Sequence, residues 1–359
     1  MPEIHATRRG RAQEQVAGVG ADAALITSGP NVRYLTGLDS SNAALLLPAS
    51  GAGILATDSR YELAARRDCG DLELVMERFI EPRLAAEMTS RALHTVAFEA
   101  HEMTVERHAE LEAKAGGVKI IPFGRKIEEL RTVKDPSELE LLATACRISM
   151  QAIADVFAQI RPGVTERQLA AVLDRRMVDL GADGPAFQTI VASGANGAFP
   201  HHVPADRPLR RGDLITMDFG AQYGGYNADM TRTVALGEPA GWQREIYELV
   251  AAAQRAGIEA ARPGADVADV DAAARDLIRD AGHGDHFGHG LGHGIGLEVH
   301  EAPTIGYART GKLASWVPVT VEPGVYLPGR GGVRIEDVLV VGAGGPGLLT
   351  TTTRELLVL

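Results

Sequence analysis

Cysteine and positive charge are both scarce in this chain. Its 359 residues include only two cysteines, Cys69 and Cys146, and 36 Lys and Arg stand against 47 Asp and Glu, for a formal net charge of −11. Two isolated thiols exclude a disulfide framework and a cysteine-based metal site, as is typical of proteins in a reducing cytosol. The acidic balance argues against nucleic acid as a partner, because no basic stripe offsets it.

Long apolar runs are also missing. The N-terminal residues have no apolar core of the signal-peptide type, and no stretch approaches the roughly 18 continuous apolar residues of a membrane-spanning helix. Hydrophobic residues at 45% and charged residues at 23% exclude wholesale disorder. At roughly 100–200 residues per domain, we expect two domains in a cytoplasmic protein with no membrane partner.

The first predicted domain, residues 1–132, alternates apolar strands with helical segments, which predicts an α/β domain. Strands are expected at 23–27, 43–47, 53–57 and 118–122, and helices at 61–67 and 81–93. The cluster Ser28-Gly29-Pro30-Asn31 predicts a turn.

The second predicted domain, residues 133–359, begins with a helix-start signal. Asp135 can cap the helix, Pro136 suits its first position, and Glu138 can return the capping bond. Helices are expected over about 136–160, 165–180, 240–261 and 266–281, packed on a mostly antiparallel sheet in an α+β domain. The helix-pair-then-hairpin order of 137–235 recurs loosely at 240–342 and suggests a pseudo-symmetric duplication.

Two predicted hairpins each bring carboxylates together. With Gly224-Gly225 as the turn, Asp218 faces Thr231, and Asp229 becomes its diagonal neighbour on the same face. Two carboxylates on an apolar sheet repel unless a metal or a shared proton compensates. A solvent-facing Asp near a turn is the alternative for either residue alone.

The C-terminal hairpin repeats this arrangement. A loop centred on Gly329 places Glu322 opposite Glu336, both within strands rich in Val and Ile, where an uncompensated carboxylate is costly. The alternative is a pair of edge-strand carboxylates that reach water. Four carboxylates carry a charge of −4, which two divalent cations would cancel.

Two further segments are rich in histidine. Residues 287–301 alternate glycine with His289 and His293 and end near His300, and the glycines are expected to let the backbone approach a ligand closely. An upstream loop presents His201 and His202, of which one should enter a cleft, because successive residues of an extended segment point to opposite faces. Carboxylates with an imidazole suit Mn²⁺, Co²⁺, Fe²⁺ or Zn²⁺.

These motifs together resemble the pita-bread metallopeptidases, the family of aminopeptidase P, prolidase, methionine aminopeptidase and the metal-free creatinase. The resemblance rests on D-F-G at 218–220, N-A-D-M-T-R-T at 227–233, G-H-G-I-G-L-E-V-H-E at 292–301, V-E-P-G-V-Y at 321–326 and G-G-V-R-I-E-D at 331–337. Residues 1–132 look like the creatinase/prolidase-type N-terminal domain. The resemblance implies a pita-bread catalytic domain, with pseudo-symmetric helix pairs on a curved antiparallel sheet.

The resemblance also assigns residues. It implies that two divalent ions, Mn²⁺ first among them, are held by Asp218, Asp229, His293, Glu322 and Glu336, with Asp229 and Glu336 bridging. It matches His201 to the family's catalytic-site histidine in the P-H segment and His289 and His300 to the two that contact the scissile group. It makes Glu322 the residue that takes and relays a proton. Thr231 and Arg334 are then expected to orient the carboxylate ligands.

The implied reaction is hydrolysis of an Xaa-Pro bond by a metal-bridging hydroxide. Strict dipeptidases of this family tend to carry Arg after the Pro of H-E-x-P, where this chain has Thr304. We therefore expect an aminopeptidase of the aminopeptidase P type that acts on proline-containing peptides, as a homodimer. An Xaa-Pro dipeptidase with the same centre is the alternative, followed by a non-catalytic peptide-binding module.

Overall fold

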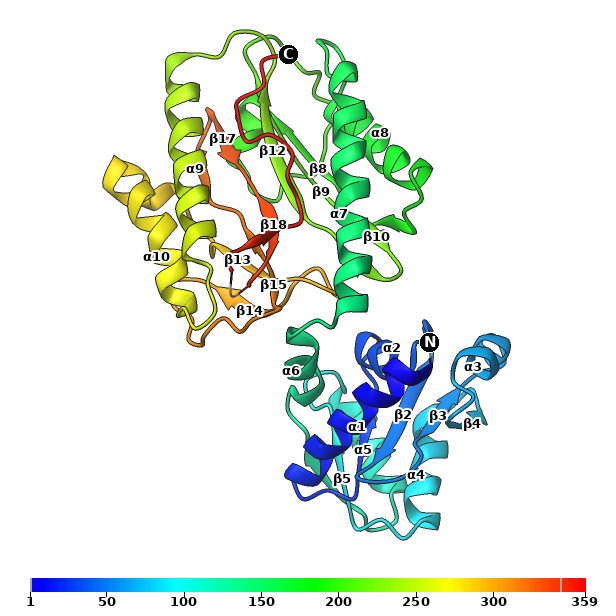
Figure 1. Ribbon diagram of the computed structural model, residues 1–359. Coiled ribbons are helices and arrows are strands. Elements are labelled where there is room, and N and C mark those ends of the chain that lie inside the picture. Colours follow the sequence, from blue (N-terminus) through cyan, green and yellow to red (C-terminus); the bar gives the residue numbers. More distant parts are fainter. Residues whose placement is uncertain (1, 343) are drawn as a thin grey trace. The chain divides into compact units, whose positions relative to one another are not determined.

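The computed structural model describes residues 2–342 and 344–359 and divides into two compact units, Met1–Arg131 and Thr132–Leu359. The boundary expected from the sequence lies between residues 132 and 133. Figure 1 shows both units along the chain.

The first unit is built on a mixed six-stranded sheet in the order β4-β3-β2-β1-β5-β6. Strand β1 pairs antiparallel with β2 and parallel with β5. The strands are β1 (Ala23–Ile26), β2 (Ala43–Pro48), β3 (Ile54–Thr57), β4 (Glu73–Met76), β5 (Thr95–Phe98) and β6 (Lys119–Pro122). The helices are α1 (Pro2–Gly18), α2 (Gly29–Thr36), α3 (Glu62–Asp68), α4 (Ile80–Ser90), α5 (Val105–Lys114) and α6 (Lys126–Thr132).

One local prediction in this unit is wrong. The expected turn at 28–31 is the start of helix α2, with Ser28 as its N-cap residue and Pro30 in the first turn. Proline suits that position because the first amides of a helix have no intrahelical acceptor. The residues that predict a turn therefore mark the start of a helix, which ends at Gly37 with a φ of 80°.

The second unit places two helix pairs around antiparallel strands (Figure 1). The helices are α7 (Pro136–Val156), α8 (Glu166–Asp179), α9 (Gly241–Ala260) and α10 (Val267–Ile278). The longer strands are β8 (Ile190–Ser193), β9 (Leu214–Phe219), β12 (Met230–Ala235), β14 (Glu301–Ile305), β15 (Pro318–Val321), β16 (Gly324–Leu327), β17 (Gly331–Arg334) and β18 (Asp337–Val340). The shorter strands are β7 (Gly184–Pro185), β10 (Ala221–Tyr223), β11 (Tyr226–Asn227), β13 (Gly292–Gly294) and β19 (Gly347–Leu348), and η1–η4 (Phe157–Gln159, Gly194–Ala198, Arg279–His283 and Gly284–His286) are short helical turns.

Each helix pair covers its own half of the core. Apolar side chains of α7 and α8 pack with β9 and β12 in one cluster, which includes Ile153, Leu173 and Met217. Those of α9 and α10 pack with β15 and β17 in another, which includes Val250 and Val319. The fold class predicted from the sequence is confirmed, with an α/β domain followed by paired helices on antiparallel strands.

Helix α7 begins as the sequence predicts. The Asp135 carboxylate accepts hydrogen bonds from the amides of Ser137 and Glu138, and Glu138 accepts one from the Asp135 amide at 3.0 Å. Such a cap contributes about 1 kcal/mol. The stretch Pro136–Gln159 is the one helix of the described residues that is long and apolar enough to cross a membrane, with a mean hydropathy of 1.3. Helices in the core of a soluble protein can be equally long and apolar, so these two properties do not identify a membrane span.

Candidate metal centre

The first carboxylate hairpin has the predicted register. Asp218 pairs with Thr231 across β9 and β12, and Gln222 pairs with Asn227 beyond them. Gly220 is required between the two segments, because a Cβ there would lie 1.7 Å from the carbonyl oxygen of Ala228. The strands therefore approach closely just where Asp218 and Asp229 line one cavity.

The second hairpin also has the predicted register. Val325 pairs with Val333 on one side of the carboxylates, and Val321 pairs with Asp337 on the other. Glu322 and Glu336 lie in the gap between these paired segments, and both line the cavity that Asp218 and Asp229 line. The two hairpins, about a hundred residues apart in sequence, thus contribute two carboxylates each.

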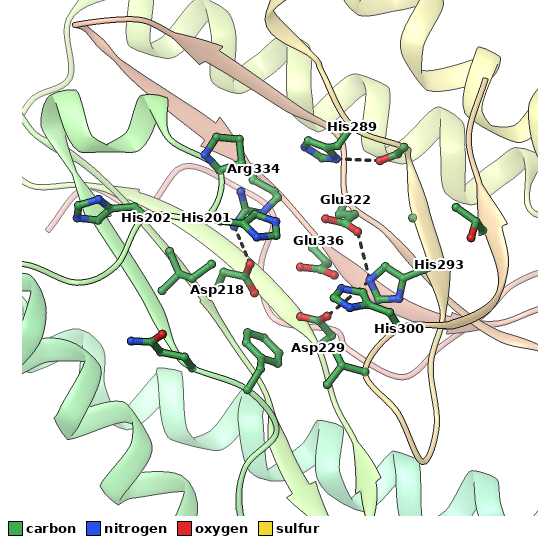
Figure 2. A pocket seen from close by; sticks show the side chains of 18 of the residues that line it. His201, His202, Asp218, Asp229, His289, His293, His300, Glu322, Arg334 and Glu336 are labelled. Carbon is green, nitrogen blue, oxygen red and sulfur yellow. Dashed lines mark hydrogen bonds and ion pairs between the residues drawn. The ribbon is translucent and has the colours of Figure 1, made fainter. Parts of the chain in front are cut away.

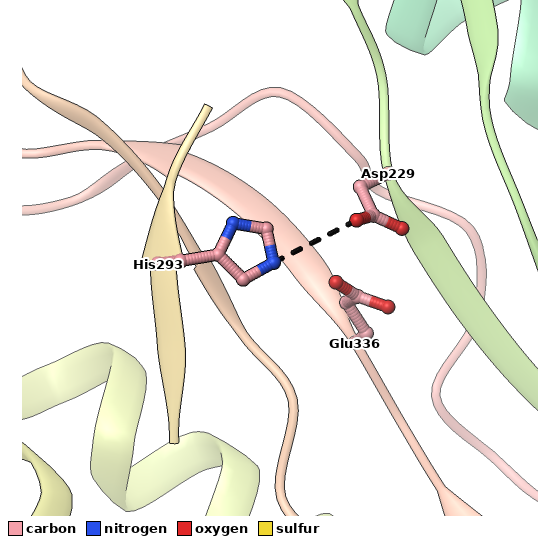
Figure 3. Close-up of side chains that lie close together, drawn as sticks. All are labelled: Asp229, His293 and Glu336. Carbon is pink, nitrogen blue, oxygen red and sulfur yellow. Dashed lines mark ion pairs between the residues drawn. The ribbon is translucent and has the colours of Figure 1, made fainter. Parts of the chain in front are cut away.

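His293 on β13 completes a compact group. Asp229, His293 and Glu336 each offer a ligand atom, and these atoms lie within 4.8 Å of one another (Figure 3). The His293 Nε2 lies 3.4 Å from Glu322 Oε1 and 3.8 Å from Asp229 Oδ2. Since His293 Nδ1 donates to the carbonyl of Gly294 at 3.0 Å, Nε2 is the nitrogen that can bind a metal ion.

The charges in this group are costly without a cation. Burial first, and then the neighbouring carboxylates, raise the pKa of Asp229 and of Glu336 well above the usual range. Burial also opposes ionisation of Glu322, but His293 outweighs it and lowers the pKa of Glu322. The buried atoms Asp218 Oδ1 and Asp229 Oδ1 accept no hydrogen bond from the described part of the chain. A divalent cation would satisfy both atoms and offset the repulsion, so the donor set fits a metal centre.

Arg334 and Thr231 connect the carboxylates from behind. Arg334, 3% exposed, donates to Asp218 Oδ2 at 2.6 Å, to the Tyr326 hydroxyl at 2.8 Å and to Thr231 Oγ1 at 3.1 Å. The Thr231 hydroxyl donates to Glu336 Oε2 at 2.7 Å. The bonds to Asp218 and Glu336 fix the directions of these two carboxylates, as expected of groups that orient metal ligands.

Besides His293, the three other predicted histidines line the same cavity, which has a volume of about 530 Å³. His289 Nδ1 donates to the carbonyl of Gly290, so Nε2 accepts from the Tyr326 hydroxyl at 2.9 Å. The ring of His300 lies edge-on to that of His293, with centroids 4.4 Å apart. Burial lowers the pKa of both His289 and His300, which favours neutral imidazoles at neutral pH.

The third, His201, lies in the loop after η2. Figure 2 shows its ring and that of His202 directed to different sides, and the two residues lie in a turn closed by the bond from the His202 amide to the Phe199 carbonyl at 3.2 Å. The His202 Nε2 lies 2.8 Å from Glu166 Oε2. Both residues contribute to the lining of the cavity.

The alternating glycines also allow close packing within the sheet, and Gly290 and Gly292 line the cavity as well. A Cβ at Gly292 would lie 2.0 Å from the Thr320 carbonyl oxygen, and one at Gly294 would lie 2.1 Å from that of Ala302. These glycines let β13 fit between β14 and β15, so the close approach is to neighbouring strands. They thereby place His293 next to the carboxylates.

Comparison with known proteins identifies the family. Residues 140–343 match metallopeptidase family M24, and residues 8–133 match the Creatinase/Prolidase N-terminal domain. The chain belongs to metallopeptidase family M24. The family implies hydrolysis of peptide bonds with divalent metal ions, in agreement with the donor set described above.

The M24 peptidase resembles relatives along nearly its whole length. It is 36% identical to an Xaa-Pro dipeptidase of Pyrococcus horikoshii, over 94% of each chain. The structure of an Xaa-Pro dipeptidase from Bacillus anthracis superimposes with a TM-score of 0.96 at 34% identity, covering 99% of this chain and 100% of that one. The structure of an X-Pro aminopeptidase from Thermotoga maritima superimposes with a TM-score of 0.89 at 36% identity, covering 96% and 100%.

Several polar groups around the centre of the M24 peptidase had no predicted role. Tyr326 joins His289 to Arg334 and lies inside the motif V-E-P-G-V-Y, so its position in that motif was the available signal. Lys134 pairs with Glu301, the residue after His300, at 2.8 Å in the interior. Such pairs join residues that are far apart in sequence, so no local sequence pattern predicts them.

Proposed function

We propose that this M24 peptidase is an Xaa-Pro dipeptidase, a prolidase, that hydrolyses the bond between the first residue and proline in a dipeptide. The observation that carries the proposal is the cavity in which four carboxylates and His293 converge, in a chain that matches named Xaa-Pro dipeptidases over its whole length. The aminopeptidase P reading, expected from Thr304, becomes the second candidate, because the similarity favours the dipeptidases.

The proposed ligands are Asp218, Asp229, His293, Glu322 and Glu336, holding two divalent ions, with Mn²⁺ before Co²⁺, Zn²⁺ or Fe²⁺. When bound, the ions supply a Lewis acid for the scissile carbonyl and lower the pKa of water. Asp229, His293 and Glu336 form the most compact part of this set.

The other residues divide the remaining tasks of hydrolysis. Glu322, whose pKa is lowered next to His293, is ionised and accepts a proton from the attacking water, then donates it to the proline nitrogen as that nitrogen leaves. His300 stabilises the negative charge that develops on the carbonyl oxygen. His289, whose two ring nitrogens both have hydrogen-bond partners, lines the cavity with a fixed tautomer. His201 holds the substrate from the opposite wall.

The second candidate is an aminopeptidase that releases the first residue from longer Xaa-Pro peptides. Two observations favour it: the similarity to the X-Pro aminopeptidase structure, and the uncharged Thr304 in the cavity wall, a position at which strict dipeptidases of the family tend to carry an arginine. A threonine supplies no ion pair to the terminal carboxylate of a dipeptide.

The deciding experiment compares Ala-Pro with Ala-Pro-Ala after Mn²⁺ loading. A higher kcat/KM for the dipeptide supports the dipeptidase, and a higher value for the tripeptide supports the aminopeptidase. Cleavage of neither peptide, together with no bound metal by mass spectrometry, would support a non-catalytic peptide-binding module. A cytoplasmic location and a homodimer are part of the proposal, to be checked by fractionation and by light scattering.

A further inference from the structure

One buried carboxylate lies behind the loop that carries His201. Glu166 begins helix α8, and its side chain is 0% exposed. Its Oε1 accepts the amide and hydroxyl of Ser193, at 2.8 and 2.6 Å, and the Asn196 side-chain amide at 3.0 Å. Its Oε2 accepts His202 Nε2 at 2.8 Å and the Ala205 amide at 3.1 Å. One side chain therefore collects hydrogen bonds from both ends and the middle of residues 193–205.

The carboxylate is held in its ionised form. Burial opposes ionisation of Glu166, but the hydrogen bonds from Ser193, His202 and Asn196 outweigh it and lower its pKa. Charge-assisted hydrogen bonds of this kind are roughly twice as strong as neutral ones. Without Glu166 these donors would lose this acceptor, which costs free energy for buried groups.

Helix α8 does not need this side chain for its own start. Thr165 caps it by accepting from the Gln168 amide, and Gln168 returns the bond to the Thr165 amide. The contacts of Glu166 go instead to the loop, whose outer residues Phe199 and Val203 are 62% and 61% exposed. Glu166 thus supplies most of the hydrogen bonds between α8 and this loop, beside one backbone bond from the Arg167 amide to the Ala205 carbonyl at 3.1 Å.

We propose that Glu166 is a positioning residue that holds the 193–205 loop so that His201 faces the substrate. Glu166 binds the ring of His202 and thereby fixes the turn at residues 199–202, which is closed by the bond from the His202 amide to the Phe199 carbonyl at 3.2 Å and carries His201 in the cavity wall (Figure 2). The inference deepens the proposed peptidase function and rests on it for its kinetic consequence.

A double-mutant cycle tests whether Glu166 acts on catalysis through His201. Glu166→Gln keeps the size of the side chain but replaces one acceptor with a donor, and it should lower kcat/KM for Ala-Pro by on the order of 100-fold, the cost of a misplacement of about 1 Å. Added to His201→Ala, the same change should cost less than about threefold, because the residue it positions is already absent. Multiplicative losses would overturn the proposal.

The matched control is Asp206→Asn. Asp206 pairs with Arg167 of the same helix at 2.8 Å, but both side chains are exposed, at 79% and 63%. This variant should keep kcat/KM within about twofold, because exposed ion pairs contribute little. A loss equal to that of Glu166→Gln would overturn the assignment to Glu166.

A second readout does not depend on activity. Amide hydrogen exchange at Ser193 and Ala205 should accelerate about tenfold or more in Glu166→Gln and stay unchanged in Asp206→Asn. If the wild-type protein cleaves no Xaa-Pro peptide, the proposed function fails while the exchange result still decides the role of Glu166 in the loop. If Glu166→Gln does not fold, Ser193→Ala, which removes one of the five donors, should give a smaller change in the same direction, and unchanged exchange at Ala205 would count against the proposal.

Discussion

Replacing Thr304 should change how this peptidase distinguishes dipeptides from longer peptides. Thr304 lies on β14, paired across the strands with His293, and its side chain is exposed at the cavity wall. The Cα atoms of paired residues in antiparallel strands lie about 4.5–5.5 Å apart. A substrate whose scissile bond lies against the metal ligands therefore places its next polar group within reach of a long side chain at position 304.

Thr304→Arg should favour the dipeptide. A charge-assisted hydrogen bond contributes about 1.5–3 kcal/mol when sheltered, whereas an exposed ion pair contributes about 0–1 kcal/mol. Position 304 is exposed but borders the cavity, so an intermediate value of about 1–2 kcal/mol applies. This corresponds to roughly a 5- to 30-fold gain in kcat/KM for Ala-Pro over Ala-Pro-Ala.

The assay measures both peptides in parallel at low and high salt, with Thr304→Gln as the control. Glutamine adds length and hydrogen bonding without charge, so it should leave the ratio nearly unchanged. The arginine effect should decrease at high salt, because the pair is open to solvent. Equal changes in kcat/KM for both peptides, or an equal effect of glutamine, would refute an ion pair with the terminal carboxylate.

Three further predictions concern the centre itself. Asp229→Ala should abolish peptidase activity and lower the metal content per chain. The metal-free variant should nevertheless melt at no lower a temperature than the metal-free wild type, because the substitution removes a buried carboxyl group that its neighbours repel. Near-normal turnover would exclude Asp229 as a ligand. Mn²⁺ binding should release protons, because burial and neighbouring carboxylates raise the pKa of Asp229 and Glu336 and the ion binds their ionised forms. Calorimetry should therefore show the Kd for Mn²⁺ falling as pH rises, by up to about tenfold per pH unit for each proton released. A pH-independent Kd would contradict this. Arg275 donates a hydrogen bond to the carbonyl of His289 at 2.6 Å. Arg275→Met should therefore lower kcat/KM by on the order of 100-fold and leave the metal content unchanged. The control, Arg279→Met, lies at an exposed position four residues later and should have no measurable effect on kcat/KM.

The local geometry of this protein is largely determined by its sequence. Gly224-Gly225 and Gly329 define two hairpin turns, and the alternation of strand residues then places Asp218 opposite Thr231 and Glu322 level with Glu336. The cap at Asp135 is local in the same way. These predictions hold because turn geometry and hydrogen-bond register depend on residues close together in the chain.

Local patterns were less reliable where two structures share one signal. Ser28-Gly29-Pro30-Asn31 suits a turn and a helix start equally, and packing of the helix selected the second. The glycines around His293 suit approach to a ligand or to a neighbouring strand; the structure shows the close approach to β14 and β15, and Gly290 and Gly292 also line the cavity.

Only the tertiary structure decided how the two hairpins meet. Asp229 and Glu336 are a hundred residues apart, and the packing of two helix-covered halves brings their carboxylates together with His293. Packing within the first half places Glu166 next to the His201 loop, although the sequence shows it only as part of a helix start. Ligand types and spacings are local properties, whereas burial, the raised carboxyl pKa values and the buried unpaired oxygens arise only when distant segments exclude water from one another.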